Sequence, residues 1–158
     1  MHPSDPAARL VEAFERIHWE RMRGLPVVSR VLEVEAVGFT HWRGRQLGVL
    51  IAPWFMNLML LPGKGDDWRG LSKGARQHWE LPAGEFEFFV AEVAAITYQS
   101  CALFTSVLEF QDQATARAVA LEVMRRIMKP GETGSGADAS PMDATTISRR
   151  ELLRRYLG

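Results

Sequence analysis

Two apolar runs decide the fold: Leu47-Gly48-Val49-Leu50-Ile51-Ala52 and Phe55-Met56-Asn57-Leu58-Met59-Leu60-Leu61, with only Pro53-Trp54 between them. Each run is apolar on both faces, which is typical of a strand in the middle of a sheet. Pro53 bounds the first run and Pro62-Gly63 closes the second, as expected where strands end. We therefore predict two central strands here.

Further strands are predicted on both sides of this pair. Apolar and polar residues alternate over residues 31–39 and 85–93, and residues 79–81 and 98–108 read as additional strands. Turns are expected at Arg43-Gly44-Arg45 and Pro82-Ala83-Gly84. Because no helix of crossover length separates these strands, we expect an antiparallel or mixed central sheet.

A helix is predicted at each end of this run of strands. The first begins at Ser4 or Asp5 and stops at Gly24-Leu25-Pro26. The second is capped by Asp112 and stops before Lys129-Pro130. Strands in the middle with helices at both ends predict the α+β class. The apolar face of the second helix consists of Ala116, Val119, Ala120, Val123 and Ile127.

The chain divides into three parts by composition. Residues 1–129 read as a single globular domain, which is an ordinary domain length. Residues 130–146 are rich in Gly, Ser, Ala and Pro and predict a flexible linker with a span of roughly 20–25 Å. Residues 147–158 form a basic amphipathic tail. We expect this flexible C-terminal segment to be tethered to the domain rather than packed in it.

Charge is distributed unevenly although the formal net charge of the 158 residues is zero. The tail carries four arginines and one glutamate, whereas the other residues hold 15 Lys and Arg against 18 Asp and Glu. An acidic body argues against a nucleic-acid partner, which needs a basic surface on the folded part. It is compatible with a basic peptide as the partner.

Targeting signals and cysteines point to a cytoplasmic protein. The sequence has no run near the roughly 18 apolar residues of a membrane span, and its first residues lack the regions of a secretory signal. A single cysteine, Cys101, excludes an internal disulfide and a Cys-x-x-Cys pair. We therefore expect no membrane insertion and a reducing compartment.

The tail contains a motif that resembles the start of a twin-arginine export signal. Ser148-Arg149-Arg150-Glu151-Leu152-Leu153 has the paired arginines followed by leucines, but too few residues follow for it to export its own chain. One interpretation is that the tail imitates the signal of a partner. The other is a short helix with a Ser148–Glu151 capping box and an apolar face, and the sequence leaves both open.

The central segment resembles a known family. Gly48-Val49-Leu50-Ile51-Ala52-Pro53-Trp54, Leu60-Leu61-Pro62-Gly63, Leu81-Pro82-Ala83-Gly84 and Tyr98-Gln99-Ser100-Cys101, in this order, are similar to the HybE/HupJ-type accessory proteins of nickel–iron hydrogenases. The resemblance covers roughly residues 8–128. It implies a cytoplasmic assembly chaperone without catalytic activity or cofactor, which attends large or small hydrogenase subunit precursors and restrains twin-arginine-dependent export.

Aromatic and acidic residues are the candidates for partner binding. Pro53, Trp54, Met56 and Trp68 stand at strand ends or loops, where Trp and Met can line an adaptable apolar groove; core filling is the alternative. Guanidinium groups pair with carboxylates, so an arginine pair needs acidic residues beside that groove. The first candidates are Asp66 and Asp67, and the second are Glu85 and Glu87; solvated surface carboxylates are the alternative.

Nothing in the sequence predicts an active site or a metal site. The four histidines lack ligand spacing, and a lone cysteine in an apolar strand is typical of core packing. A small redox or metal carrier that uses Cys101 is the alternative function. A tail that docks on a neighbouring molecule would also produce a homo-oligomer.

Overall fold

The computed structural model describes residues 5–130. The predicted linker and the signal-like tail, including Ser148, Arg149, Arg150, Leu152 and Leu153, lie outside these residues. The described elements are, in order, α1 (Pro6–Ile17), the π-helical turn η1 (His18–Met22), β1 (Glu35–Trp42), β2 (Arg45–Ala52), β3 (Phe55–Leu61), β4 (Arg76–Leu81), β5 (Gly84–Val93), β6 (Ile96–Phe104) and α2 (Gln113–Ile127).

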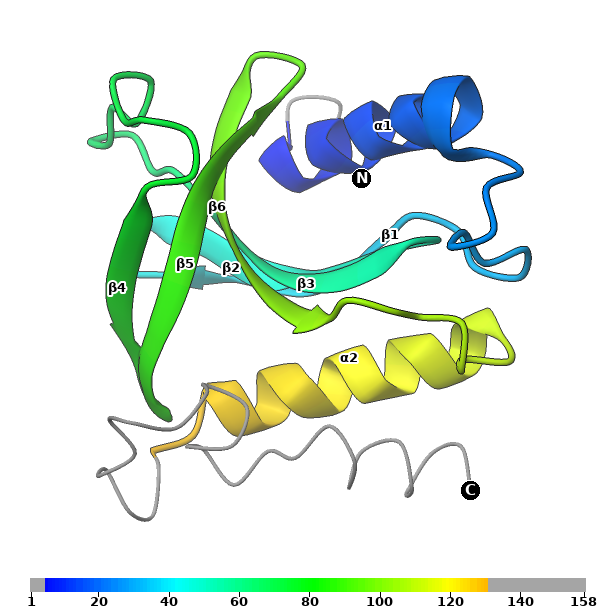
Figure 1. The fold of residues 1–158 in the computed structure, drawn as a ribbon. Coiled ribbons are helices and arrows are strands. Elements are labelled where there is room, and N and C mark those ends of the chain that lie inside the picture. Colours follow the sequence, from blue (N-terminus) through cyan, green and yellow to red (C-terminus); the bar gives the residue numbers. More distant parts are fainter. Residues whose placement is uncertain (1–4, 131–158) are drawn as a thin grey trace.

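The six strands form one antiparallel sheet in the order β1-β2-β3-β6-β5-β4. Each predicted central strand lies between two neighbours, whereas β1 and β4 are the edges. The two helices pack on opposite faces of this twisted sheet (Figure 1). The predicted α+β fold, with a helix from each end of the domain, is confirmed.

The strands β2 and β3 are apolar on both faces because each face supports a different core. Toward α2 the sheet contributes Val49, Leu58 and Leu60, which are fully buried with the predicted apolar face of that helix. Toward α1 it contributes Leu50 and Met59, which pack with Leu10 and Phe14 of the helix. Both cores therefore depend on the same two central strands.

Hydrogen bonds cap both helices as predicted. The carboxylate of Asp5 accepts the N–H of Ala7 at 2.9 Å, and that of Asp112 accepts the N–H of Thr115 at 2.7 Å. The first helix is regular only to Ile17 and continues to Met22 as the π-helical turn. None of the helices within residues 5–130 is long and apolar enough to cross a bilayer.

Several predicted strand boundaries are wrong, and two of them differ by four residues. The strand predicted over residues 31–39 begins at Glu35, because the preceding residues are held by other bonds: Ser29 Oγ accepts the N–H of Leu32, and Gln113 Oε1 accepts the N–H of Glu33. The strand predicted to reach residue 108 ends at Phe104, before a turn closed by Phe110 N–H on the carbonyl of Val107.

Candidate functional site

The predicted partner-binding residues fall into three separate places. Pro53, Trp54 and Met56 lie where β2 turns into β3, whereas Asp66, Asp67 and Trp68 follow the other end of β3. Since β3 has seven residues, these two groups are about 20 Å apart along the strand. Glu85 and Glu87 lie on β5. The sequence-based grouping of all these residues around one groove is not seen in the structure.

Trp54 is the only member of the first group that reaches the surface of the described residues. Pro53 and Met56 are buried, and Met56 belongs to the core on the α2 side, so the prediction that these two line an open groove is not supported by their burial. Trp54 is half-buried and its ring packs 6.3 Å from Phe14 and 6.1 Å from His18. His18 therefore packs against an aromatic neighbour at the end of α1.

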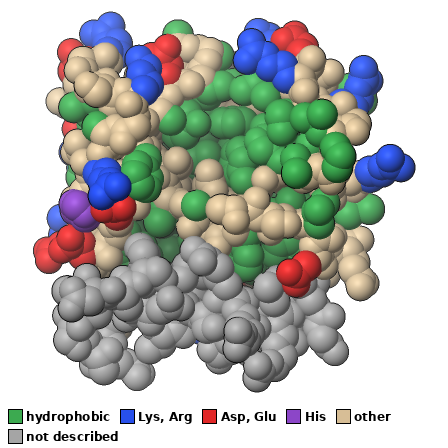
Figure 2. Space-filling view, in the orientation of Figure 1, with side chains coloured by type: hydrophobic (Ala, Val, Ile, Leu, Met, Phe, Trp, Pro, Cys, Tyr) green, Lys and Arg blue, Asp and Glu red, His purple; other side chains and the backbone are tan. Residues whose placement is uncertain are grey.

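An apolar surface surrounds Trp54 on the α1 side. Figure 2 shows hydrophobic side chains gathered, and the surface hollowed, over the region where Figure 1 draws α1 and the sheet beneath it. Beyond η1, apolar side chains are exposed by about half of their area. The partly buried residues of this surface are Val11, Ile17, Ala36, Phe39, Trp54, Phe55, Ala91 and Ile96. The exposed apolar residues in and after η1 are Trp19, Leu25, Val27 and Val31.

Asp66 is held by an arginine of the same chain. Its Oδ1 accepts a hydrogen bond from Arg45 at 2.8 Å, and its Oδ2 accepts the N–H of Gly63 at 2.8 Å. The Arg45 hydrogen bond is the main cause that lowers the pKa of Asp66. Arg45 also stacks on Trp79 with its guanidinium 4.7 Å from the ring centroid. Asp66 therefore stabilises the loop that follows β3.

Asp67 forms an exposed ion pair with a neighbouring arginine. Its Oδ1 lies 3.2 Å from Nε of Arg69, and both side chains are largely exposed. Hydrogen bonding to Arg69 lowers the pKa of Asp67. An exposed ion pair of this kind contributes about 0–1 kcal/mol, so a partner could displace it. The two carboxylates that are the first candidates for binding an arginine pair thus each face an arginine of the same chain already.

Trp68 packs mainly in the core. It is 8% exposed and its ring lies 6.2 Å from that of Trp79, which in turn contacts Trp42 edge-on at 5.9 Å. Trp79 Nε1 donates to Gln99 Oε1 at 2.7 Å. Trp68 therefore belongs to a row of packed tryptophans at one end of the sheet. At most one edge of its ring can face a groove, although the sequence predicts an open position.

Glu85 and Glu87 lie on the outward face of the β4–β5 hairpin. In the strand register, Glu80 stands directly opposite Glu85, His78 opposite Glu87, and Arg76 opposite Phe89. His78 Nε2 is 3.1 Å from Glu87 Oε2, and Phe89 is 40% exposed. We call residues 76, 78, 80, 85, 87 and 89 the hairpin face. Sequence reasoning missed Glu80, although its alternation with Trp79 and Leu81 was a usable signal.

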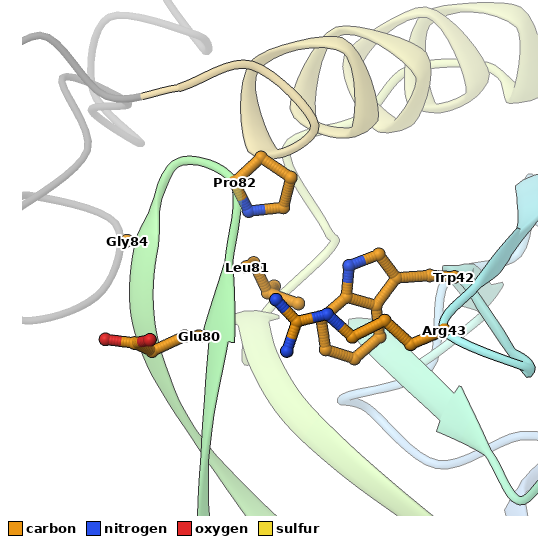
Figure 3. Close-up of a pocket in the computed structure, with 6 residues that line it drawn as sticks. All are labelled: Trp42, Arg43, Glu80, Leu81, Pro82 and Gly84. Atoms are coloured by element: carbon orange, nitrogen blue, oxygen red, sulfur yellow. The ribbon is translucent and has the colours of Figure 1, made fainter.

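A small pocket lies between the β1–β2 and β4–β5 turns (Figure 3). Its volume is about 290 Å³. Arg43 covers the ring of Trp42 at 5.0 Å, and Leu81 and Pro82 form the opposite wall, while the Glu80 carboxylate points away from Trp42. The pocket is therefore lined by both polar and apolar groups, and its acidic residue, Glu80, belongs to the hairpin face.

Cys101 lies in the core. It is 5% exposed on β6 and belongs to the apolar cluster on the α2 side, which agrees with the packing interpretation. Within residues 5–130, no group of three or more His, Cys, Asp and Glu side chains is arranged to hold a metal ion. Replacing Cys101 by Ala separates the alternatives, because a carrier that uses the thiol loses its activity and a chaperone keeps partner binding.

Sequence and structure comparisons with known proteins point to one family. The family model described as "NiFe-hydrogenase assembly, chaperone, HybE" matches residues 5–155. "Hydrogenase expression/formation protein HoxT" of Azotobacter vinelandii is 38% identical over 94% of both chains. "Probable rubredoxin HupJ" of Rhodobacter capsulatus is 41% identical over 76% of this chain, an alignment that spans 44% of that longer protein. The solution structure of HybE from Escherichia coli matches with a TM-score of 0.64 and 25% identity, covering 85% of this chain and 84% of that one.

Proposed function

Because the chain belongs to the HybE family of NiFe-hydrogenase assembly chaperones, we propose that it binds hydrogenase subunit precursors and the twin-arginine signal peptide of a precursor. In this proposal the protein acts in the cytoplasm, before export, and catalyses no reaction. The large and the small subunit are both candidates. The hairpin face is the surface that receives the paired arginines.

The observation that carries the proposal is the pair of carboxylates Glu80 and Glu85. They stand directly opposite each other on neighbouring strands, with Glu87 two residues further along β5. Like charges in this position destabilise a sheet, so a cationic partner that neutralises them gains affinity. Arginine suits the role better than lysine because its planar guanidinium pairs with a carboxylate through two hydrogen bonds.

The order of groups along β5 matches the order of groups in the signal. Glu85, Glu87, Phe89 and Ala91 follow one another at every second residue on the same side of the strand. At about 3.4 Å per residue, Glu85 and Phe89 are separated by roughly 14 Å. An extended peptide beside β4, which is an edge strand, would present its arginines to the carboxylates and its leucines to Phe89.

The apolar surface on the α1 side suits the subunit itself. It begins at Ala91 and Ile96, where the row of residues on β5 reaches the core on that side, and it extends to Trp54 and the exposed Trp19. Exposed apolar patches on soluble proteins are commonly interaction sites. We propose that exposed apolar segments of an unfinished subunit bind here while the signal peptide occupies the hairpin face.

A photo-crosslink at Phe89 tests the proposal in cells. A benzophenone amino acid at position 89 should crosslink to a hydrogenase precursor that carries its signal peptide, and the crosslink should disappear when the two signal arginines are replaced. The same group at Leu108, which is 53% exposed outside the hairpin face and the apolar surface, is the matched control. Equal crosslinking from both positions, or a crosslink that ignores the signal, would refute it.

A further inference from the structure

Three segments that are far apart in sequence enclose a second pocket. They are the first turn of α1, the loop after β3, and the turn between β5 and β6. The pocket has a volume of about 550 Å³, which lies within the range of sites for small ligands or a few side chains. We call it the α1–loop pocket; it is lined by Pro6, Arg9, Leu61, Pro62, residues 64–69 and residues 94–97.

The charge of this pocket is positive. Its two carboxylates already have partners, since Asp66 is bound by Arg45 and Asp67 lies beside Arg69. Arg9 and Lys64 line the pocket as well, and among the described residues neither has an ion-pair partner. The pocket therefore repels an arginine pair and attracts a carboxylate.

The helix end adds to this preference. The pocket includes the first turn of α1, where the partial positive charge of the helix dipole is concentrated. The carboxylate of Asp5 offsets part of that charge, but its Oδ1 is engaged by the N–H of Ala7. Arg9, one turn further into α1, is exposed and adds a full charge on the same side.

Apolar residues form part of the pocket wall, and an unused polar group lies among them. Leu61 is fully buried, Trp68 presents one edge, and Ile96 is half-buried. Thr97 is 7% exposed, and its Oγ1 has no hydrogen-bond partner among the described residues. A buried hydroxyl without a partner is uncommon, and this residue lies on the wall of the pocket.

We propose that the α1–loop pocket binds a peptide segment of a partner protein in which a carboxylate stands next to a large apolar side chain. Arg9 and Lys64 bind the carboxylate, and Pro62, Ile96 and the exposed edge of Trp68 contact the apolar side chain. A small inorganic anion would leave these apolar walls uncovered, whereas a purely apolar segment would leave the two cations unused. The site does not depend on the proposed binding of export signals, because it selects the opposite charge.

Two capped peptides that differ in one group test the charge selection. Titration of Gly-Leu-Glu-Leu-Gly and of its Gln counterpart into the full chain should show at least tenfold tighter binding of the Glu peptide. The backbone amide resonances of Ala94, Ala95 and Thr97 should shift during that titration, because these residues line the pocket. Equal affinity for the two peptides, or shifts confined to other residues, would overturn the proposal.

Charge reversal with a matched control locates the site. In the variant R9E/K64E, the ratio of the affinities for the Glu and Gln peptides should fall at least tenfold. In R21E/R30E, an equal charge change at exposed arginines outside the pocket, this ratio should stay as in wild type. If R9E/K64E does not fold, R9Q/K64Q provides the same test with a smaller perturbation. Shifts of the same amides with protein concentration alone would identify a second copy as the occupant and contradict the proposal.

Discussion

At the residue scale, the turn between β5 and β6 carries backbone strain. Ala94 and Ala95 have φ angles of 48° and 66°, the left-handed region that glycine adopts most easily. A95G should therefore raise the free energy of unfolding by about 1 kcal/mol, as measured by urea denaturation. A102G, at an exposed position inside β6, should lower it by about 0.5–1 kcal/mol. A destabilising A95G would show that the turn is not strained.

At position 48, glycine is needed for a steric reason, because no side chain fits there. A Cβ atom on this β2 residue would collide with the ring of Phe39, which crosses it from β1. G48A should lower the free energy of unfolding by roughly 2 kcal/mol, because the ring must move off the sheet. In the F39A background, G48A should lower the free energy of unfolding much less than it does in wild type. Additive losses in this double-mutant cycle would contradict the contact.

The roles of single residues were the hardest feature to predict from sequence. A carboxylate in a glycine-rich loop, such as Asp66, suggests an available binding group, but its partner Arg45 is 21 positions away and only the fold brings them together. The positions of Met56 and Trp68 suggest exposure, yet Met56 is buried in the core and Trp68 exposes only one edge, which lines the α1–loop pocket. Glu85 and Glu87 alternate with buried phenylalanines, and that local pattern correctly places them outside.

At the element scale, α2 contains a buried carboxylate that pairs with two arginines of the same helix. Glu122 is 8% exposed and pairs with Arg125 and Arg126, which lower its pKa to about 2. Because the pKa of Glu122 is lower in the folded state than in the unfolded state, the ionised carboxylate stabilises the fold at pH values above the ordinary pKa near 4.3. This contribution is lost as the pH falls toward 2. Between pH 5 and pH 2.5, wild type should lose on the order of 2 kcal/mol more stability than E122Q. Parallel pH profiles of the two proteins in urea denaturation would contradict this assignment.

Elements with strong local patterns were predictable, and their ends were not. The two central strands and the buried face of α2 follow from apolar periodicity, and the hairpin follows from Pro82-Ala83-Gly84. Residues 31–34 also alternate, but bonds to Ser29 and Gln113 keep them outside the sheet. The first half of β4 was missed because this edge strand has exposed and half-buried residues without a large apolar side chain before Trp79.

At the scale of the whole molecule, the two proposed sites prefer opposite charges. The hairpin face carries three carboxylates, and the α1–loop pocket carries two cations without ion-pair partners among the described residues. A precursor could therefore be recognised at two points, by a basic segment and by an acidic one. The tail, residues 147–158, is basic and would compete for the hairpin face only.

Truncation after Pro130 tests this competition. A tethered segment has an effective concentration near the millimolar range, so even a weak mimic would occupy the hairpin face for much of the time. Truncation should therefore tighten binding of a twin-arginine peptide, and R149Q/R150Q should have the same effect. If the tail docks on a neighbouring molecule, truncation should also shift the protein toward the monomer in light scattering. Unchanged affinity would mean that the resemblance of the tail to an export signal is coincidental.

Titration of a twin-arginine peptide into variants of the hairpin face tests the central claim most directly. We expect E80Q/E85Q/E87Q to weaken binding at least tenfold, and replacement of both peptide arginines by lysine to weaken binding to wild type in the same direction. E12Q/E15Q/E109Q, with three exposed carboxylates neutralised elsewhere, should bind as wild type does. Unchanged affinity for E80Q/E85Q/E87Q, with the fold intact by circular dichroism, would contradict the claim that the hairpin face receives the export signal.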